Sequence, residues 1–220
     1  MDIGKSFTFM FEDEDWITKY LIGCVFVLLS PVLIGIPFLF GYTVDLIRNV
    51  AEGESSPLPD WGDAGAKFVK GIIALLIGAI YMLPAILLGC IAAVVGVAAS
   101  NGSNANAIVG LFIACINCLV ALWTLLAAIV YPAGLTRYAV TGEFMAAFQF
   151  GRVFRYIGDH AGDYAVARVL TWITQFVAQI IGLIICLVGI IFTGFWSILV
   201  YGHMFGQVYR AGEAESTEVV

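Results

Sequence analysis

Two thiols in the middle of the chain have a spacing that is associated with metal binding and redox chemistry. Cys115 and Cys118 form a CxxC pair, which places both thiols on one face of a helix. A zinc site needs two more ligands, and the sequence holds no second CxxC and no histidine pair. A redox pair needs an accessible setting that stabilises a thiolate, but these cysteines lie in an apolar run. We therefore expect both to be packing residues.

Acidic residues near a histidine or near each other are the other candidates for catalysis or metal binding. His160 lies between Asp159 and Asp163, and Asp60 and Asp63 flank Trp-Gly after a proline. A solvated loop explains the first group and a fixed interfacial turn the second. The sequence contains no phosphate-binding glycine loop, no nucleophile elbow and no HExxH. We therefore predict a protein that is not an enzyme, with no catalytic residue, metal or cofactor.

Four polar residues lie inside long apolar stretches, where polar groups are costly and often mark a transport pathway. These residues are Asn117, Gln175, Gln179 and His203. One hypothesis is that they line a small polar cavity. The interpretation we favour is that they form hydrogen bonds between helices, which requires no substrate.

Composition identifies the environment of these residues as a membrane. The chain has 220 residues, of which 61% are hydrophobic and 12% charged, whereas soluble domains are about 25% charged. Charged residues are absent from 20–44, 71–136 and 169–209. One bilayer crossing takes about 20 apolar residues, so these gaps have room for about one, two and two crossings. The formal net charge of −6 argues against nucleic acid as a partner.

The predicted fold class is all-α, because lipid offers the backbone no hydrogen-bond partners and the long apolar runs do not alternate as barrel strands do. We expect a single domain over residues 1–220, a polytopic helical bundle with five to six membrane segments. The expected segments are an interfacial N-terminal segment at 1–15, helices at 68–99 and 107–135, an amphipathic cytoplasmic interfacial helix within 137–168, two helices within 169–209 joined near Gly189, and a disordered tail at 211–220.

The first apolar gap has two interpretations. Pro31 and Pro37, with Gly35 between them, would either kink one helix strongly or divide the gap into a hairpin of two short helices. Cytoplasmic loops carry an excess of Lys and Arg, which places both long polar stretches inside. A hairpin puts all ten basic residues on that side, so we favour it. We predict a multi-pass cell-membrane protein with a cytoplasmic C-terminus. We also expect Asp45 and Arg48 to form an ion pair at the end of this gap.

Small residues recur at positions where helices could approach closely. Membrane helices associate through close backbone contact at such residues. The expected packing face consists of Gly71, Gly78, Ala85 and Ala92, spaced by seven, and the GxxxG pair Gly202 and Gly206.

Several stretches resemble a prokaryotic membrane-protein family known as domain of unknown function 4013. They are Glu14–Lys19, Gly41–Arg48, Gly53, Leu58–Trp61, Phe68–Gly71, Tyr81–Pro84 and Phe205–Arg210. The resemblance spans nearly the whole chain, supports a single membrane domain and implies a location in a prokaryotic plasma membrane, but it implies no activity or functional residue. We expect a non-enzymatic membrane component that contacts the lipid bilayer and packs with itself or with a partner subunit. The alternative is a transporter or channel-like protein for a small or lipidic solute.

Overall fold

The computed structural model describes residues 2–100, 107–185 and 188–218, in which helices joined by short loops predominate and no strand occurs. The chain divides into two compact units. The larger unit comprises Met1–Leu75 and Pro132–Val220, and the smaller unit comprises Leu76–Tyr131.

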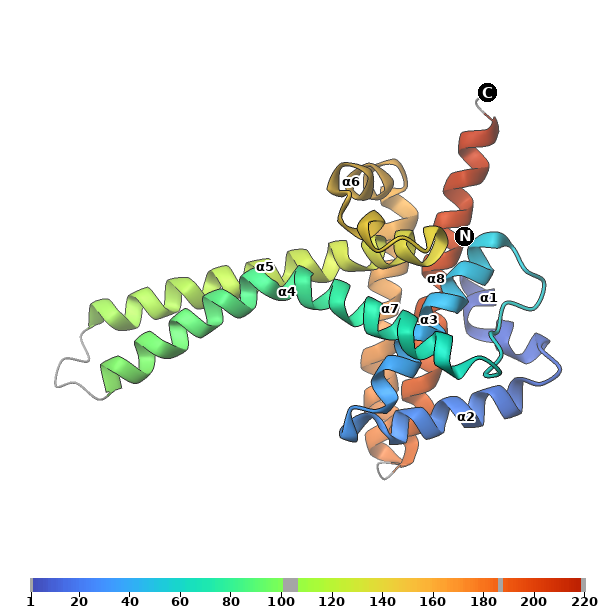
Figure 1. Cartoon of the computed structure of the whole chain (residues 1–220), viewed down its shortest axis with the longest axis horizontal. Helices are drawn as coiled ribbons and strands as arrows, with labels where there is room; N and C mark the ends of the chain where they lie inside the picture. The colour runs from blue at the N-terminus through green and yellow to red at the C-terminus, as the bar shows by residue number, and fades with distance from the viewer. Residues whose placement is uncertain (1, 101–106, 186–187, 219–220) are drawn as a thin grey trace. The chain divides into compact units, whose positions relative to one another are not determined.

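Figure 1 labels the α-helices, and the short 3-10 helices η1 to η3 lie between them in the chain. In chain order, the helices are α1 (Ile3–Thr8), η1 (Phe9–Glu12), α2 (Trp16–Leu28), η2 (Ser30–Val32), α3 (Gly35–Glu52), α4 (Ala64–Ser100), α5 (Ala107–Thr141), η3 (Phe144–Phe148), α6 (Phe150–Asp159), α7 (Ala161–Ile184) and α8 (Val188–Glu218). Within the described residues, α4, α5, α7 and α8 are long and apolar enough to cross a membrane, and α2 is a shorter apolar helix. The predicted class of helical membrane fold is confirmed.

The first apolar gap folds as a hairpin, the alternative favoured from the sequence. Helix α2 ends at Leu28, and Leu33 adopts a left-handed backbone with φ of 64° before α3 begins. Gly35 lies so close to the Phe26 carbonyl oxygen that a Cβ there would overlap it. The 13 residues of α2 span only about 20 Å, which is less than the hydrocarbon thickness of about 30 Å.

The last apolar gap also folds as a helical hairpin. Helix α7 ends at Ile184 and α8 begins at Val188, a few residues before the turn expected near Gly189. A Cβ at Gly182 would lie 2.7 Å from Ile190 Cα, and one at Gly189 would lie 2.9 Å from Gly182 O. These glycines therefore let the two backbones approach closely next to the break.

The core of the larger unit lies between α3 and α8. Tyr42 and Leu46 of α3 and Phe195 and Leu199 of α8 are almost completely buried. The N-terminal segment packs onto this core, and the Phe9 ring stacks on the His203 ring at 4.2 Å. Residues expected to lie on the bilayer surface therefore contact α8. Helix α8 itself continues to Glu218, so the part of the 211–220 tail within the described residues is helical, whereas disorder was expected.

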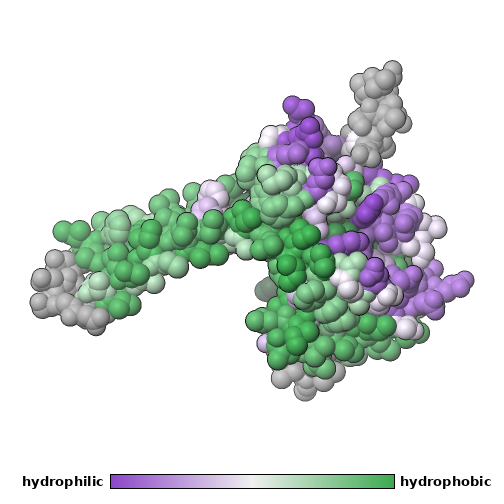
Figure 2. Space-filling view, in the orientation of Figure 1, coloured by the Kyte–Doolittle hydropathy of each residue, from purple (hydrophilic) through white to green (hydrophobic). Residues whose placement is uncertain are grey.

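Helix α6 is the amphipathic helix expected within 137–168. Its Val153 and Tyr156 are buried, whereas Arg152 and Arg155 are exposed. In the space-filling view, hydrophilic residues of the larger unit gather near α6 and near the N-terminal segment (Figure 2).

The smaller unit is a pair of helical segments, 76–100 of α4 and 107–131 of α5, which run side by side (Figure 1). Trp123 Nε1 donates a hydrogen bond of 2.9 Å to Tyr81 O, and the Tyr81 and Tyr131 rings lie 6.1 Å apart. Nearly all of its visible face is hydrophobic (Figure 2), as expected for helices that contact lipid or another apolar helix.

Candidate functional site

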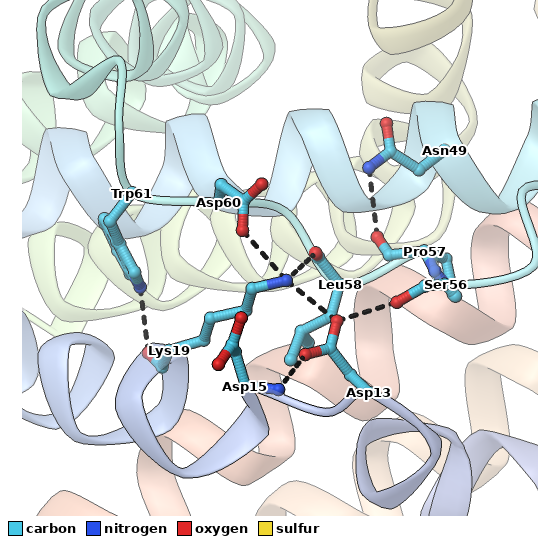
Figure 3. A network of polar contacts seen from close by, with 9 residues as sticks. All are labelled: Asp13, Asp15, Lys19, Asn49, Ser56, Pro57, Leu58, Asp60 and Trp61. Carbon is cyan, nitrogen blue, oxygen red and sulfur yellow. Dashed lines mark hydrogen bonds and ion pairs between the residues drawn. The ribbon is translucent and has the colours of Figure 1, made fainter.

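The densest group of polar contacts joins the N-terminal segment, α2 and the loop between α3 and α4 (Figure 3). The Lys19 ammonium lies 2.8 Å from Asp13 Oδ2 and 2.9 Å from Asp60 Oδ1. It also donates to the Leu58 carbonyl at 3.1 Å. Ser56 Oγ donates to Asp13 Oδ2 at 2.7 Å. We call these five residues the Lys19 cluster.

The central charges of the Lys19 cluster are shielded from solvent. The side chains of Asp13 and Lys19 are 6% and 13% exposed, whereas that of Asp60 is 82% exposed. Burial raises the pKa of Asp13, but hydrogen bonds from Lys19, Ser56 and the Asp15 amide outweigh burial and lower it. Burial lowers the pKa of Lys19, but Asp13 and Asp60 outweigh burial and raise it. Both groups are therefore held in their charged forms.

Tryptophan and asparagine side chains hold the loop of the Lys19 cluster in place. Trp61 Nε1 donates to Lys19 O at 2.8 Å, and Asn49 Nδ2 donates to Pro57 O at 3.1 Å (Figure 3). The Trp61 ring stacks on Tyr42 at 4.5 Å and on Phe26 at 4.7 Å. Hydrogen bonds and ring stacking thus fix the loop against both arms of the α2–α3 hairpin.

A second charged group lies where α3 crosses the start of α4. Asp45 contacts the ammonium of Lys67 at 2.8 Å and that of Lys70 at 2.5 Å. The expected Asp45–Arg48 ion pair is therefore wrong, and Arg48 instead pairs with Glu52 on the same helix at 2.8 Å. The reason is the helix crossing, which brings two lysines of α4 to Asp45.

Glycines explain how closely α3 and α4 approach. A Cβ at Gly41 would overlap the Lys67 carbonyl oxygen, and a Cβ at Gly71 would overlap the Pro37 carbonyl oxygen. The two glycines, one on each helix, let the backbones touch. This contact places Lys67 and Lys70 within reach of Asp45, so the ion pairs depend on the glycines.

The chemistry available in both charged groups is electrostatic. The carboxylates of the buried Asp13 and the partly buried Asp45 each contact a lysine, so each charge is compensated. Asp63, expected in an interfacial turn, accepts a hydrogen bond from Ala66 N at 3.0 Å and so caps the start of α4. Among the described residues, no three His, Cys, Asp or Glu side chains lie close enough to hold a metal ion.

The four polar residues predicted within apolar stretches lie at three different places. Gln175 and Gln179 line a groove of about 760 Å³ between α2, α3, α7 and α8. His203 lines a separate cavity of about 350 Å³ beside the N-terminal segment, where its Nδ1 lies 3.0 Å from Ser6 Oγ. Asn117 is an exposed residue of the smaller unit. The structure therefore joins the two glutamines but does not bring His203 to their groove.

The predicted packing residues also lie in different surroundings. In the larger unit, a Cβ at Gly202 would lie 2.8 Å from Leu46 Cδ2, and one at Gly206 would lie 2.6 Å from Val50 Cβ. Gly71 faces α3, as described above. In the smaller unit, Ala85 and Ala92 are buried, and a Cβ at Gly78 would make an ordinary 3.4 Å contact with Tyr131.

Sequence reasoning missed the Lys19 cluster. A lone lysine next to an acidic run and directly before an apolar stretch was the available signal, but its partners Leu58 and Asp60 lie about forty residues away. The structure also places the candidates with a reactive spacing. Cys115 and Cys118 are exposed on α5, and His160 Nδ1 lies 3.1 Å from the Tyr156 carbonyl of its own helix turn.

Comparison with known proteins identifies the family of the chain. The model of a family described as "Protein of unknown function (DUF4013)" matches residues 24–187. No curated protein and no solved structure matches the chain. The match covers most of the sequence, including the crossing at Gly41 and Gly71 and the loop at Leu58–Trp61. The chain therefore belongs to the DUF4013 family of proteins of unknown function.

Proposed function

We propose that this chain is a multi-pass component of a prokaryotic plasma membrane that acts by packing with a second copy or with another membrane subunit. In this proposal it is not an enzyme, and its C-terminus faces the cytoplasm. The observation that carries the proposal is the low burial of the apolar residues of α5. Only 17% of the most apolar stretch of α5 is buried within the chain, compared with 56% for that of α8.

Two kinds of glycine support a further helix contact. Gly71, Gly202 and Gly206 already lie against helices of this chain. Gly89 and Gly110 have no atom within 4 Å of the position of a Cβ, and apolar side chains surround them on α4 and α5. Membrane helices associate by close approach at small residues. Gly89 and Gly110 are therefore positions at which a helix of another subunit could pack closely.

The test is native mass spectrometry of the full chain extracted gently from its own membranes. We expect a fixed oligomer or a defined second subunit, and we expect Gly89→Leu to dissociate it. Leu87→Phe is the matched control, because Leu87 is 56% exposed on the same helix and the change keeps the surface apolar. A wild-type protein that is monomeric and free of any second subunit would contradict the proposal.

A second candidate function is transport of a small or lipidic solute. The observation that favours it is the groove lined by Gln175 and Gln179, which lies between helices and combines amides with apolar side chains. A monomer that carries a specific small molecule in the same mass spectra would favour this function. Loss of that molecule in Gln175→Leu would place it in the groove.

A further inference from the structure

Arg168 is an unpaired cation on the border of an apolar stretch. It is the last charged residue before the 41 uncharged residues 169–209. Its guanidinium Nε is buried and has no hydrogen-bond partner, and no side chain within the described parts of the chain forms an ion pair with it. An uncompensated charge in such surroundings is costly, so an anion from outside the chain would stabilise it.

The environment of Arg168 connects it to the groove of Gln175 and Gln179. Its guanidinium carbon lies 4.7 Å from the centre of the Trp172 ring, which is one helical turn further into the apolar stretch and lines the groove. Gln175 and Gln179 follow at successive turns, so the three groove residues extend about 16 Å along α7 from Arg168.

The groove itself has the chemistry of a site for a long apolar chain. Its volume of about 760 Å³ lies within the roughly 300–1,000 Å³ of ligand sites. Its walls include Val27 and Leu39 of the α2–α3 hairpin and Ile190 and Ile198 of α8. Within the part of the chain that the structure describes, the amides of Gln175 and Gln179 bond to no other residue, so their N–H groups are available to a ligand.

We infer that this groove binds a phospholipid, with the phosphate on Arg168, a glycerol ester at Gln175 and an acyl chain along the apolar walls. The guanidinium is the preferred partner of phosphate oxygens, and amide N–H groups suit ester carbonyls. The level of Arg168, at the end of the charge-free stretch, is where a bilayer places its phosphates. The site goes beyond the proposed function, because binding a lipid in this groove requires neither assembly nor transport.

The test uses the full chain in mild detergent, with lipid binding measured by native mass spectrometry and the melting temperature by circular dichroism. The ligands are phosphatidylglycerol, diacylglycerol with the same acyl chains, and inorganic phosphate. We expect phosphatidylglycerol to bind at least tenfold more tightly than diacylglycerol, because a hydrogen bond to a charged group is worth about a factor of ten or more. Inorganic phosphate should not displace it.

Arg168→Gln should weaken phosphatidylglycerol binding by about tenfold or more, and the lipid should then no longer raise its melting temperature. Arg155→Gln, which removes an exposed arginine of α6, is the matched control and should bind like the wild type. Gly194→Leu keeps the charge but fills the groove, where a Cβ would lie 3.8 Å from Val27 Cγ1, and it should weaken binding of both lipids.

A lipid-free melting temperature for each variant separates loss of the site from loss of the fold. Three outcomes would overturn the inference: equal binding by Arg168→Gln and the wild type, equal binding of diacylglycerol and phosphatidylglycerol, or displacement of the lipid by inorganic phosphate. Each of them is independent of the oligomeric state, so the site and the proposed assembly can fail separately.

Discussion

Replacing Lys19 with methionine removes the charge at the centre of the Lys19 cluster while keeping most of the apolar stem. The ammonium contacts Asp13, Asp60 and the Leu58 carbonyl in the folded protein. After the substitution, the carboxylate of Asp13 stays buried and keeps hydrogen bonds from Ser56 Oγ and the Asp15 amide alone. We expect the free energy of unfolding to fall because this buried charge loses its counterion.

The size of the effect follows from the burial of the two partners. Removing one member of a buried ion pair costs about 3–5 kcal/mol, and the two hydrogen bonds that Asp13 retains place Lys19→Met near the lower value. Asp60 is 82% exposed, so its pair with Lys19 contributes less than about 1 kcal/mol. A loss of about 3 kcal/mol corresponds to a fall in melting temperature of roughly 6–12 °C for a chain of this length.

Thermal unfolding of the full chain in mild detergent, followed by circular dichroism, measures this difference. Asp60→Asn is the matched control, because it removes the exposed partner of the same lysine and leaves the buried pair. We expect the control to lower the melting temperature by less than about 4 °C. Equal melting temperatures for Lys19→Met and Asp60→Asn would refute the reasoning, because the Asp13–Lys19 pair would then contribute no more than a surface pair.

The pH dependence of the difference in unfolding free energy between the wild type and Lys19→Met provides a second check. The pKa of Asp13 is lowered by its partners, so its contribution is present above the ordinary value of 3.8 and is lost as the pH falls through the lowered value. The pKa of Lys19 is raised, so its contribution is present below 10.5 and is lost as the pH rises through the raised value. The difference in unfolding free energy between the wild type and Lys19→Met should therefore be largest from about pH 5 to pH 9. It should become smaller at lower and at higher pH.

Two further predictions concern the crossing of α3 and α8 and the topology. Gly206→Ala would place a Cβ 2.6 Å from Val50 Cβ and 2.9 Å from Ile47 O, so it should cost about 1–3 kcal/mol in the same melting assay. Gly158→Ala on α6, where no atom lies within 4 Å of the Cβ position, should be neutral or stabilising, and an equal loss in both variants would contradict the packing role of Gly206. Tags on the two termini should react with an impermeant reagent only after the cells are opened. A tag on the N-terminus that reacts in intact cells would contradict the hairpin topology.

The helices and their order could be predicted from the sequence because a bilayer imposes strong local rules. Stretches without charge mark the apolar helices, and Pro31 marks the break between α2 and α3. The N-terminal segment was harder to predict. Its alternating apolar residues fit a helix on a membrane surface, but the stacking of Phe9 on His203 depends on a helix almost two hundred residues away.

The charge partners could not be predicted, because they depend on where helices cross. Arg48 follows Asp45 by three residues, a spacing that suggests an ion pair on one helix. The contact of Gly41 with Lys67 O brings α4 so close to α3 that Asp45 pairs with Lys67 and Lys70 instead of Arg48. The regular spacing of small residues on α4 could be recognised in the sequence. The pairing of α4 with Gly41 of α3, and the angle at which the two helices cross, could not.

The stretches that carry the family resemblance lie far apart in the sequence, and in the larger unit they contact one another. Lys19 bonds to the Leu58–Trp61 turn, and a Cβ at Gly71 would lie 2.9 Å from Gly41 N. Gly53, which ends α3 in a left-handed conformation with φ of 79°, faces the guanidinium of Arg210. In these pairs the charges and glycines are occupied in holding helix ends together. The motifs therefore specify how the helices join, and our two proposals place function elsewhere, on the apolar face of the smaller unit and in the groove beside Arg168.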